Sequence, residues 1–174
     1  MADLVTDVAA SIRDIPDFPK PGILFKDITP VLADSKLFPR VLNWFAEKYR
    51  GQGIDRIVGI ESRGFILGAA LVEALDAGFV PARKAGKLPF ETVSVSYDLE
   101  YGSATLQMHV DAIQKGQRVL IVDDLLATGG TAAATVDLVR RLGGEVVATT
   151  FMVELGFLNG RKRLDVPVSS LMVY

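Results

Sequence analysis

The sequence has no cysteine, and its 174 residues include a single histidine, His109. A disulfide framework, thiolate chemistry and a cysteine-based zinc site are therefore excluded. No apolar run reaches the ~20 residues that a membrane-spanning helix requires, and the acidic amino-terminal segment does not read as a signal peptide. From these absences we expect a cytoplasmic protein with no membrane partner.

The sequence also lacks an excess of positive charge. Its net charge is -2 and its isoelectric point is about 5.4, so a nucleic-acid partner, which requires a basic surface, is not expected. Hydrophobic residues make up 49% of the chain and charged residues 23%, as in ordinary globular proteins. The length suits one domain with its own core, so we predict a single domain over residues 1–174.

Buried strands alternate with helices along most of the chain, as judged from apolar runs and from helical spacing. The predicted strands are 56–60, 79–84, 118–122, 145–155 and 166–174, and the predicted helices are 3–13, 64–75 and 130–143. This alternation is typical of the α/β class, with an open and mostly parallel sheet flanked by helices. Ligands of such sheets bind beyond the carboxyl ends of the strands.

Three local features depart from this alternation. Residues 14–22, DIPDFPKPG, hold three prolines and are predicted to form a loop. Ser35 is expected to cap a helix that continues to about Arg50. Residues 91–109 alternate polar and apolar side chains, which predicts a β-hairpin inserted beside the sheet.

The strongest functional signal is the stretch VLIVDDLLATGGT, residues 119–131. Two glycines between a strand and a helix let backbone amides converge on an anion, although the P-loop and dinucleotide fingerprints are absent. Asp123 and Asp124 follow the apolar run directly, where we expect the strand to end. Carboxylates there can accept hydrogen bonds from a diol. An anion loop close to a diol binder indicates a sugar 5-phosphate.

This stretch resembles the phosphoribosyl pyrophosphate motif of the type I phosphoribosyltransferases. Four further segments resemble the adenine-specific members of that family, in order and at compatible spacing. They are FPKPGILFKDITPVL at 18–32, GIESRGF at 59–65, RKAGKLP at 83–89 and YDLEYG at 97–102. The resemblance covers nearly the whole chain. It implies a Rossmann-like fold with a small base-binding hood at about 1–34 and a flap at about 91–109.

The resemblance also implies an activity. Phosphoribose would pass from 5-phosphoribosyl 1-pyrophosphate (the donor) to adenine N9, giving AMP and pyrophosphate in purine salvage, with Mg²⁺ and in a homodimer. Asp123 and Asp124 would hold the ribose hydroxyls or the water shell of Mg²⁺, with no certain direct protein ligand to the metal. The residues that would cradle the 5-phosphate are Ala127, Thr128, Gly129, Gly130 and Thr131.

For the base, the resemblance implies recognition of adenine by the backbone of Leu24 and Lys26. Phe25 and Leu125 would sandwich the ring, although a lone phenylalanine more often belongs to a core. Lys26 stands where close relatives often have arginine. A backbone role tolerates that difference more easily than a side-chain role does.

For the pyrophosphate, the resemblance implies a second group of residues. They are Glu61, Ser62, Arg63, Arg83, Lys84 and Lys87. Taken alone, the three cations at 83–87 would read as a solvated basic loop, but clustered cations are what a diphosphate requires. A cis peptide is often seen in relatives around Glu61–Ser62.

Three residues would act in catalysis. Arg63 would be directed at the diphosphate, Glu100 is the candidate acid or base facing the purine, and Tyr101 would reach the ribose-phosphate side. His109 is expected to be a hydrogen-bonded strand residue and no catalyst.

Three other functions stay open at this point. A 6-oxopurine phosphoribosyltransferase would need a donor where the 6-amino group of adenine needs an acceptor, and the match at FKDITP favours adenine. A non-catalytic regulator that binds the same donor usually carries an added DNA-binding or effector segment. A plain Rossmann-like nucleotide binder would carry the glycine fingerprint that this sequence lacks.

Overall fold

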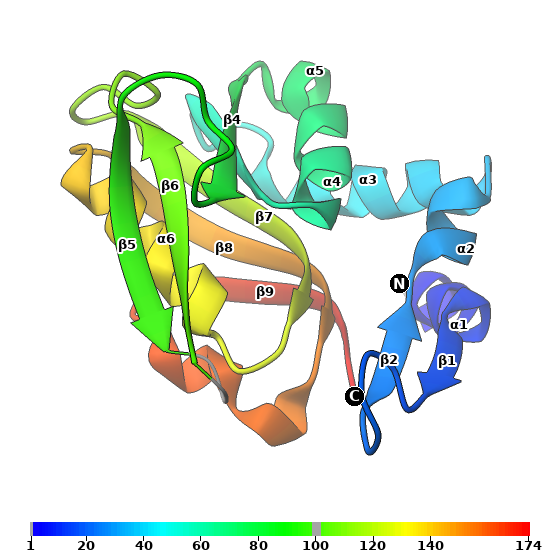
Figure 1. The fold of residues 1–174 in the computed structure, drawn as a ribbon. Helices are drawn as coiled ribbons and strands as arrows, with labels where there is room; N and C mark the ends of the chain where they lie inside the picture. Colours follow the sequence, from blue (N-terminus) through cyan, green and yellow to red (C-terminus); the bar gives the residue numbers. More distant parts are fainter. Residues whose placement is uncertain (1, 99–101) are drawn as a thin grey trace. The chain divides into compact units, whose positions relative to one another are not determined.

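The computed structural model describes residues 2–98 and 102–174 (Figure 1). The chain divides into two compact units, Met1–Phe45 (unit 1) and Ala46–Tyr174 (unit 2). Helix α3 (Leu37–Tyr49) crosses the boundary between them. Each unit is described by itself below.

Unit 1 contains a hairpin that the sequence did not predict. Strand β1 (Arg13–Pro16) pairs antiparallel with β2 (Leu24–Asp27). The loop predicted at 14–22 is thus wrong at residues 14–16, which belong to β1, and is confirmed at residues 17–22. Pro16 stands at the end of β1, a position that proline tolerates because it needs no ladder donor there. The Phe18–Pro19 peptide bond is cis. The other elements of the unit are α1 (Ala2–Ser11), α2 (Thr29–Ala33) and the start of α3.

Helix α3 is capped by Asp34 and not by Ser35, the residue predicted from the sequence. The Asp34 carboxylate accepts hydrogen bonds from the amides of Lys36 at 2.8 Å and Leu37 at 2.9 Å. These bonds, that of Leu37 first, hold the pKa of Asp34 below its ordinary value. A carboxylate at a helix start is favoured over a hydroxyl because its charge also suits the positive end of the helix dipole.

Unit 2 is built on one sheet, whose strands follow the order β5-β6-β4-β3-β7-β8-β9 among the described residues. The strands are β3 (Arg56–Ile60), β4 (Gly78–Lys84), β5 (Thr92–Asp98), β6 (Ser103–His109), β7 (Arg118–Leu126), β8 (Glu145–Glu154) and β9 (Val168–Val173). The five strands from β4 to β9 in this order run parallel. The β5–β6 hairpin joins the edge of the sheet through an antiparallel β6–β4 pairing. The open and mostly parallel α/β sheet is thus confirmed.

Helices cover both faces of this sheet (Figure 1). Val58 of β3 packs in one cluster with Leu138 of α6 (Gly130–Arg141), whereas Gly68 of α4 (Arg63–Ala70) lies against Ile57. Neighbouring residues of a strand point to opposite faces, so α4 and α6 lie on opposite sides. The remaining helices are α5 (Val72–Leu75), η1 (Gly156–Leu158) and η2 (Gly160–Arg163). The single helix predicted at 64–75 is therefore two helices.

Strand β7 continues to Leu126, beyond the end predicted at Val122. Leu125 and Leu126 still pair with Val153 and Glu154 of β8, so the acid pair lies inside the strand and does not end it. The carboxyl ends of β3, β4 and β7 consequently meet at one edge of the sheet, where ligands of such folds bind. No helix in the described part of the chain is long and apolar enough to cross a membrane.

Candidate functional site

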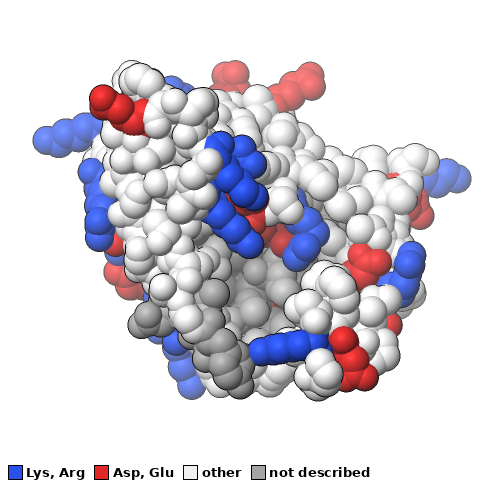
Figure 2. Space-filling view, viewed as in Figure 1, with Lys and Arg blue, Asp and Glu red and all other residues white. Residues whose placement is uncertain are grey.

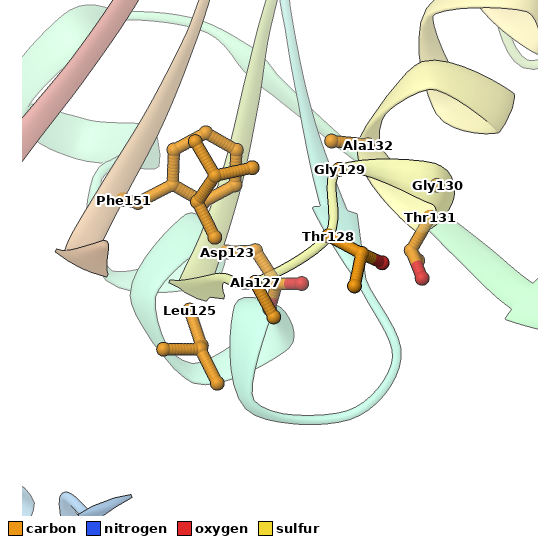
Figure 3. Close-up of a pocket in the computed structure, with 10 residues that line it drawn as sticks. Asp123, Leu125, Ala127, Thr128, Gly129, Gly130, Thr131, Ala132 and Phe151 are labelled. Carbon is orange, nitrogen blue, oxygen red and sulfur yellow. The ribbon is translucent and has the colours of Figure 1, made fainter. Parts of the chain in front are cut away.

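The loop Ala127–Gly129 joins the end of β7 to the start of α6 (Figure 3). Gly129 has φ +82° and immediately precedes the first residue of α6. This left-handed conformation, which glycine adopts without strain, turns the chain straight into the helix. Thr128 to Ala132 line a pocket of about 80 Å³ there. Because the first turn of a helix offers spare amides and partial positive charge, this pocket suits an anion.

The two acids of β7 have different environments. The Asp124 carboxylate accepts a hydrogen bond from Arg63 Nε at 2.5 Å, and its side chain is only 6% exposed. Asp123 accepts a hydrogen bond from the Asp124 amide at 2.9 Å. Burial, and then the charge of Asp124, raise the pKa of Asp123 well above its ordinary value. The site therefore holds one ion pair beside one carboxyl group whose ionisation is disfavoured.

A third group gathers around Glu61, which begins the cis Glu61–Ser62 peptide. Its buried carboxylate accepts hydrogen bonds from the Lys84 amide at 3.0 Å, from Arg83 Nε at 3.4 Å and from Lys87 Nζ. Burial opposes ionisation of Glu61, but the hydrogen bonds from Lys87 and Lys84 and the charges of Lys87 and Arg83 outweigh it, so its pKa lies below the ordinary value. Figure 2 shows Lys and Arg side chains gathered with acidic atoms between them over the carboxyl end of β4.

This Glu61 group has a simple charge balance. Arg83, Lys84 and Lys87 carry three positive charges, and Glu61 carries one negative charge. The excess is positive, and the buried carboxylate holds two of the cations in defined places. An ordered cluster of this kind can neutralise a polyanion with little reorganisation.

These groups meet at one cavity of about 450 Å³ in unit 2, a size typical of small-molecule sites. Its lining residues are Glu61, Ser62, Arg63, Lys84, Tyr97, Ala104, Leu106, Asp123, Asp124, Leu125, Ala127 and Thr131. An anion loop, an acid pair and a basic cluster therefore share one space. The arrangement can hold a molecule with a phosphate, a diol and a second, more highly charged anionic group.

Two side chains of the β5–β6 hairpin differ from expectation. Tyr97 had no predicted role, yet its hydroxyl oxygen accepts a hydrogen bond from Thr131 Oγ1 at 3.1 Å and so connects the hairpin to the start of α6. Its position in the YDLEYG segment was the only signal in the sequence. His109 was expected to be fully hydrogen-bonded, but its buried Nε2 has no hydrogen-bond partner among residues 2–98 and 102–174.

The hairpin of unit 1 carries Leu24, Phe25 and Lys26. The carbonyl of Ile23 accepts a hydrogen bond from the amide of Phe18 at 3.3 Å, on the side of β1. The N–H and C=O groups of successive residues point to alternate sides of a strand. Those of Leu24 and Lys26 therefore point to the side away from β1.

The side chains of this hairpin interact across the two strands. Lys26 Nζ lies 2.6 Å from a carboxylate oxygen of Asp14, its partner residue on β1. Phe25 makes an edge-to-face contact with Phe18, with the ring centroids 5.1 Å apart. The Lys26 side chain is thus engaged within the hairpin, which favours a backbone role for this residue. Leu125 belongs to unit 2, and Glu100 and Tyr101 lie outside the described residues.

Comparison with known proteins agrees with this geometry. Residues 31–166 match the family described as phosphoribosyl transferase domain. The chain is 60% identical over 161 residues to the adenine phosphoribosyltransferase of Myxococcus xanthus, a match that covers 92% of this chain and 88% of that protein. The chain belongs to the adenine phosphoribosyltransferase family.

Solved structures of adenine phosphoribosyltransferases have the same fold. The crystal structure of the enzyme from Rhodothermus marinus is 54% identical, with a TM-score of 0.96 and coverage of 100% of both chains. The crystal structure from Saccharomyces cerevisiae is 42% identical, with a TM-score of 0.94 and coverage of 99% of this chain and 100% of that one. The yeast protein was crystallised with an imino-altritol bisphosphate and adenine. The type I phosphoribosyltransferase fold expected from the sequence is thereby confirmed.

Proposed function

We infer that this chain transfers phosphoribose from 5-phosphoribosyl 1-pyrophosphate to adenine, forming AMP and pyrophosphate. The observation that carries the inference is the single cavity that joins the 127–131 loop, the acid pair and the Glu61 group, in a chain whose relatives are adenine phosphoribosyltransferases. In this placement the 5-phosphate binds at residues 127–131, the ribose hydroxyls at Asp123 and Asp124, and the pyrophosphate near Arg63 and residues 83–87.

The reaction exchanges one bond at the anomeric carbon for another. Adenine N9 forms a bond to C1 of the ribose, the bond from C1 to the pyrophosphate oxygen breaks, and its electron pair leaves with pyrophosphate. The proton of N9 passes to a base, the role proposed below for Glu100. Positive charge develops on the ribose and negative charge on the leaving group, so geometry and leaving-group neutralisation are the main requirements.

The chain supplies both requirements. Arg83 and Lys87, held by Glu61, neutralise the departing pyrophosphate together with Lys84. The 127–131 loop fixes the far end of the donor, and Asp123 fixes the ring by accepting hydrogen bonds from its hydroxyls. The ion pair between Arg63 and Asp124 places a cation beside the same space. A donor held at three points presents its anomeric carbon in one orientation.

The carboxylate oxygens of Asp123 and Asp124 suit Mg²⁺ that arrives bound to 5-phosphoribosyl 1-pyrophosphate. No three His, Asp or Glu residues cluster as a metal cage in the described part of the chain, and Mg²⁺ is commonly held by one or two carboxylates together with water and substrate oxygens. Asp123 and Asp124 would hold the ion through its water shell. When bound, Mg²⁺ supplies further neutralisation of the pyrophosphate charge.

Four further assignments complete the proposal. Adenine is recognised by the backbone of Leu24 and Lys26, with Phe25 and Leu125 against the ring. Glu100 is the acid or base, and Tyr101 acts on the ribose-phosphate side. The protein works as a homodimer in the cytoplasm. The peptide direction in β2 and the Lys26–Asp14 pair support the backbone role for the base site.

A purine panel tests the activity itself. With the donor and Mg²⁺, we expect adenine to release pyrophosphate and to give AMP, while hypoxanthine, guanine and xanthine give rates lower by on the order of a thousandfold or more. A site that pairs with a 6-amino group leaves polar groups unpaired against a 6-oxo group. Pyrophosphate release with hypoxanthine and not with adenine would favour the 6-oxopurine alternative, and release with none would favour a binding protein.

The raised pKa of Asp123 predicts that donor binding releases a proton. Hydrogen bonds from the ribose hydroxyls and the charge of a cation both favour the ionised form of Asp123. Binding therefore lowers the pKa of Asp123, which burial and the charge of Asp124 hold high in the free protein. Donor affinity should therefore fall as the pH falls below this raised pKa. Calorimetry of donor binding in two buffers with different ionisation enthalpies measures the released proton.

Asp123→Asn is the matched control for this experiment. The variant keeps an oxygen for the Asp124 amide but has no carboxyl proton to release. The phosphate groups of the donor titrate at about pH 6 and contribute to both proteins, so the variant should show a smaller buffer dependence than the parent. In the ligand-free protein, the raised pKa means that stability is lost as the pH rises from the ordinary aspartate pKa to the raised one. The variant avoids that loss and should melt no lower than the parent at neutral pH. The same buffer dependence in the parent and in Asp123→Asn would contradict the prediction.

A further inference from the structure

The 5-phosphate loop rests on a segment that has no place in the mechanism above. A Cβ atom on Gly160 of η2 would lie 2.1 Å from the carbonyl oxygen of Ala127 and 2.8 Å from the amide nitrogen of Gly129. A Cβ atom on Gly129 would lie 2.3 Å from the carbonyl oxygen of Gly160. The two backbones are therefore in direct contact with no side chain between them. A shift of Gly160 must displace the loop that it supports.

A backbone hydrogen bond ties the start of this segment to the same loop. The amide of Leu155 donates to the carbonyl of Leu126 at 2.9 Å, and Leu126 is the last residue of β7 before the loop. The segment after β8 thus contacts the loop region at two places. Both contacts involve backbone atoms, so the position of the segment affects the position of the loop whatever rotamers the side chains adopt.

Arg161, the neighbour of Gly160, takes part in an ion pair. Arg161 makes a two-point contact with Glu154 at the end of β8, through Nε at 3.1 Å and Nη2 at 2.5 Å. Its Nη1 donates to the carbonyl of Val168 at 2.8 Å, and Ser170 Oγ donates to Glu154 at 2.6 Å. The Glu154 side chain is 7% exposed. One side chain therefore connects η2 to β8 and β9.

Stability alone is a weak explanation for this ion pair. Glu154 is buried, but the Arg161 side chain is 47% exposed, and an ion pair with one partner in contact with water contributes little to stability. A two-point arginine–carboxylate contact does, however, fix the relative orientation of the groups that carry it. Placed directly beside the Gly160 contact, it fixes the surface on which the loop lies.

We propose that Glu154 and Arg161 are positioning residues for the donor: their ion pair holds Gly160 against Ala127 and Gly129 and so sets the geometry of the 5-phosphate site. The inference rests on the proposed function, because it takes residues 127–131 as the 5-phosphate site. Neither side chain lines the two pockets described above, so both act through the backbone of the loop.

The test compares Glu154→Gln and Arg161→Lys with the parent enzyme. Gln keeps the size of Glu154 without its charge, and Lys keeps the charge of Arg161 without the two-point contact. We expect the donor KM and the dissociation constant for ribose 5-phosphate to rise about tenfold. The adenine KM and kcat should stay within about twofold, since neither side chain is among the residues proposed for the base site or the basic cluster. This split between substrates is a readout that a general loss of stability would not produce.

Glu145→Gln is the matched control, because Glu145 begins the same strand and pairs with Arg118 through an exposed contact of 3.1 Å. It should leave both KM values unchanged. Ser170→Ala removes a single hydrogen bond to Glu154 and serves if Glu154→Gln does not fold; its donor KM should rise about fivefold. Thr131→Ala, within the loop itself, reports whether the loop binds the donor.

The outcomes separate the two proposals. If Thr131→Ala raises the donor KM while Glu154→Gln, Arg161→Lys and Ser170→Ala do not, the positioning role is wrong and the proposed function stands. Lower melting temperatures with an unchanged ribose 5-phosphate affinity lead to the same conclusion. If Thr131→Ala also leaves the donor KM unchanged, the 5-phosphate site is misplaced and the inference falls with it. A selective rise in the donor KM supports the role.

Discussion

Replacing Asp123 and Asp124 together with asparagine is expected to raise the donor KM by on the order of a hundredfold while the adenine KM changes little. In the proposed function each carboxylate accepts hydrogen bonds from donor hydroxyls or from metal-bound water, and a hydrogen bond to a charged group contributes about 1.5–3 kcal/mol. Two such losses correspond to about a hundredfold or more in affinity. Steady-state kinetics with each substrate varied in turn measures the difference.

The double variant also changes the charge that the donor meets. In the parent, Asp124 is paired with Arg63, and Asp124→Asn would release that guanidinium from its ion pair. A cation nearer to the pyrophosphate could recover part of the lost affinity, so the single variants should not add up to the double one. Asp137→Asn on the surface of α6, where the parent carboxylate accepts from Arg141 at 2.9 Å, is the control. An unchanged donor KM with normal turnover would end the ribose role of the acid pair.

The strands and the class of the fold followed from local patterns. Continuous apolar runs predicted β3, β7 and β8 because strands buried on both faces have no polar side to show. Alternating polar and apolar residues predicted the β5–β6 hairpin, because a strand with one face on the core and one face in water shows that pattern. The β1 strand was missed because prolines dominate its surroundings, and proline is tolerated at a strand end that needs no donor.

The acid pair shows why a strand end could not be predicted from charge. Two adjacent acids usually lie outside a buried strand, because burying a carboxylate is costly without a partner. Here the partner of Asp124 is Arg63, which lies 61 residues earlier in the sequence and is the first residue of α4. Only the folded sheet brings the two together, so the strand continues through the acids to Leu126.

The candidate site also has features that the sequence predicted and contacts that it did not. Residue types at the carboxyl ends of β3, β4 and β7 indicated an anion loop, a diol binder and a basic cluster, and the structure places these groups around one cavity. The pairing of Glu61 with Arg83 and Lys87 was not predicted, because it depends on β3 and β4 lying side by side in the sheet, so that the segments at their carboxyl ends meet. Tyr97 was missed for a similar reason, since its contact with Thr131 joins two elements with no shared sequence signal.

Replacing Gly129 with alanine is expected to lower kcat/KM for the donor by about a hundredfold or more, a cost typical of a displacement of about 1 Å at a site that positions substrate. Its new Cβ would lie 2.3 Å from the carbonyl oxygen of Gly160 and 3.0 Å from the carbonyl carbon. Both atoms belong to the backbone, so no side-chain rotation relieves the clash. The loop or η2 must move, and the amides proposed to surround the 5-phosphate move with it.

The same substitution carries a second, smaller cost that a control can remove. Gly129 has φ +82°, where alanine loses roughly 1–2 kcal/mol relative to its usual conformations. Gly116 has φ +83° with no atom within 4 Å of its virtual Cβ, so Gly116→Ala reproduces the backbone strain without the clash. It should lower the melting temperature and leave donor kinetics intact. If Gly129→Ala behaves like Gly116→Ala, the close approach of Gly160 has no part in donor binding; if it alone loses the donor, the loop works only in the geometry that this contact sets.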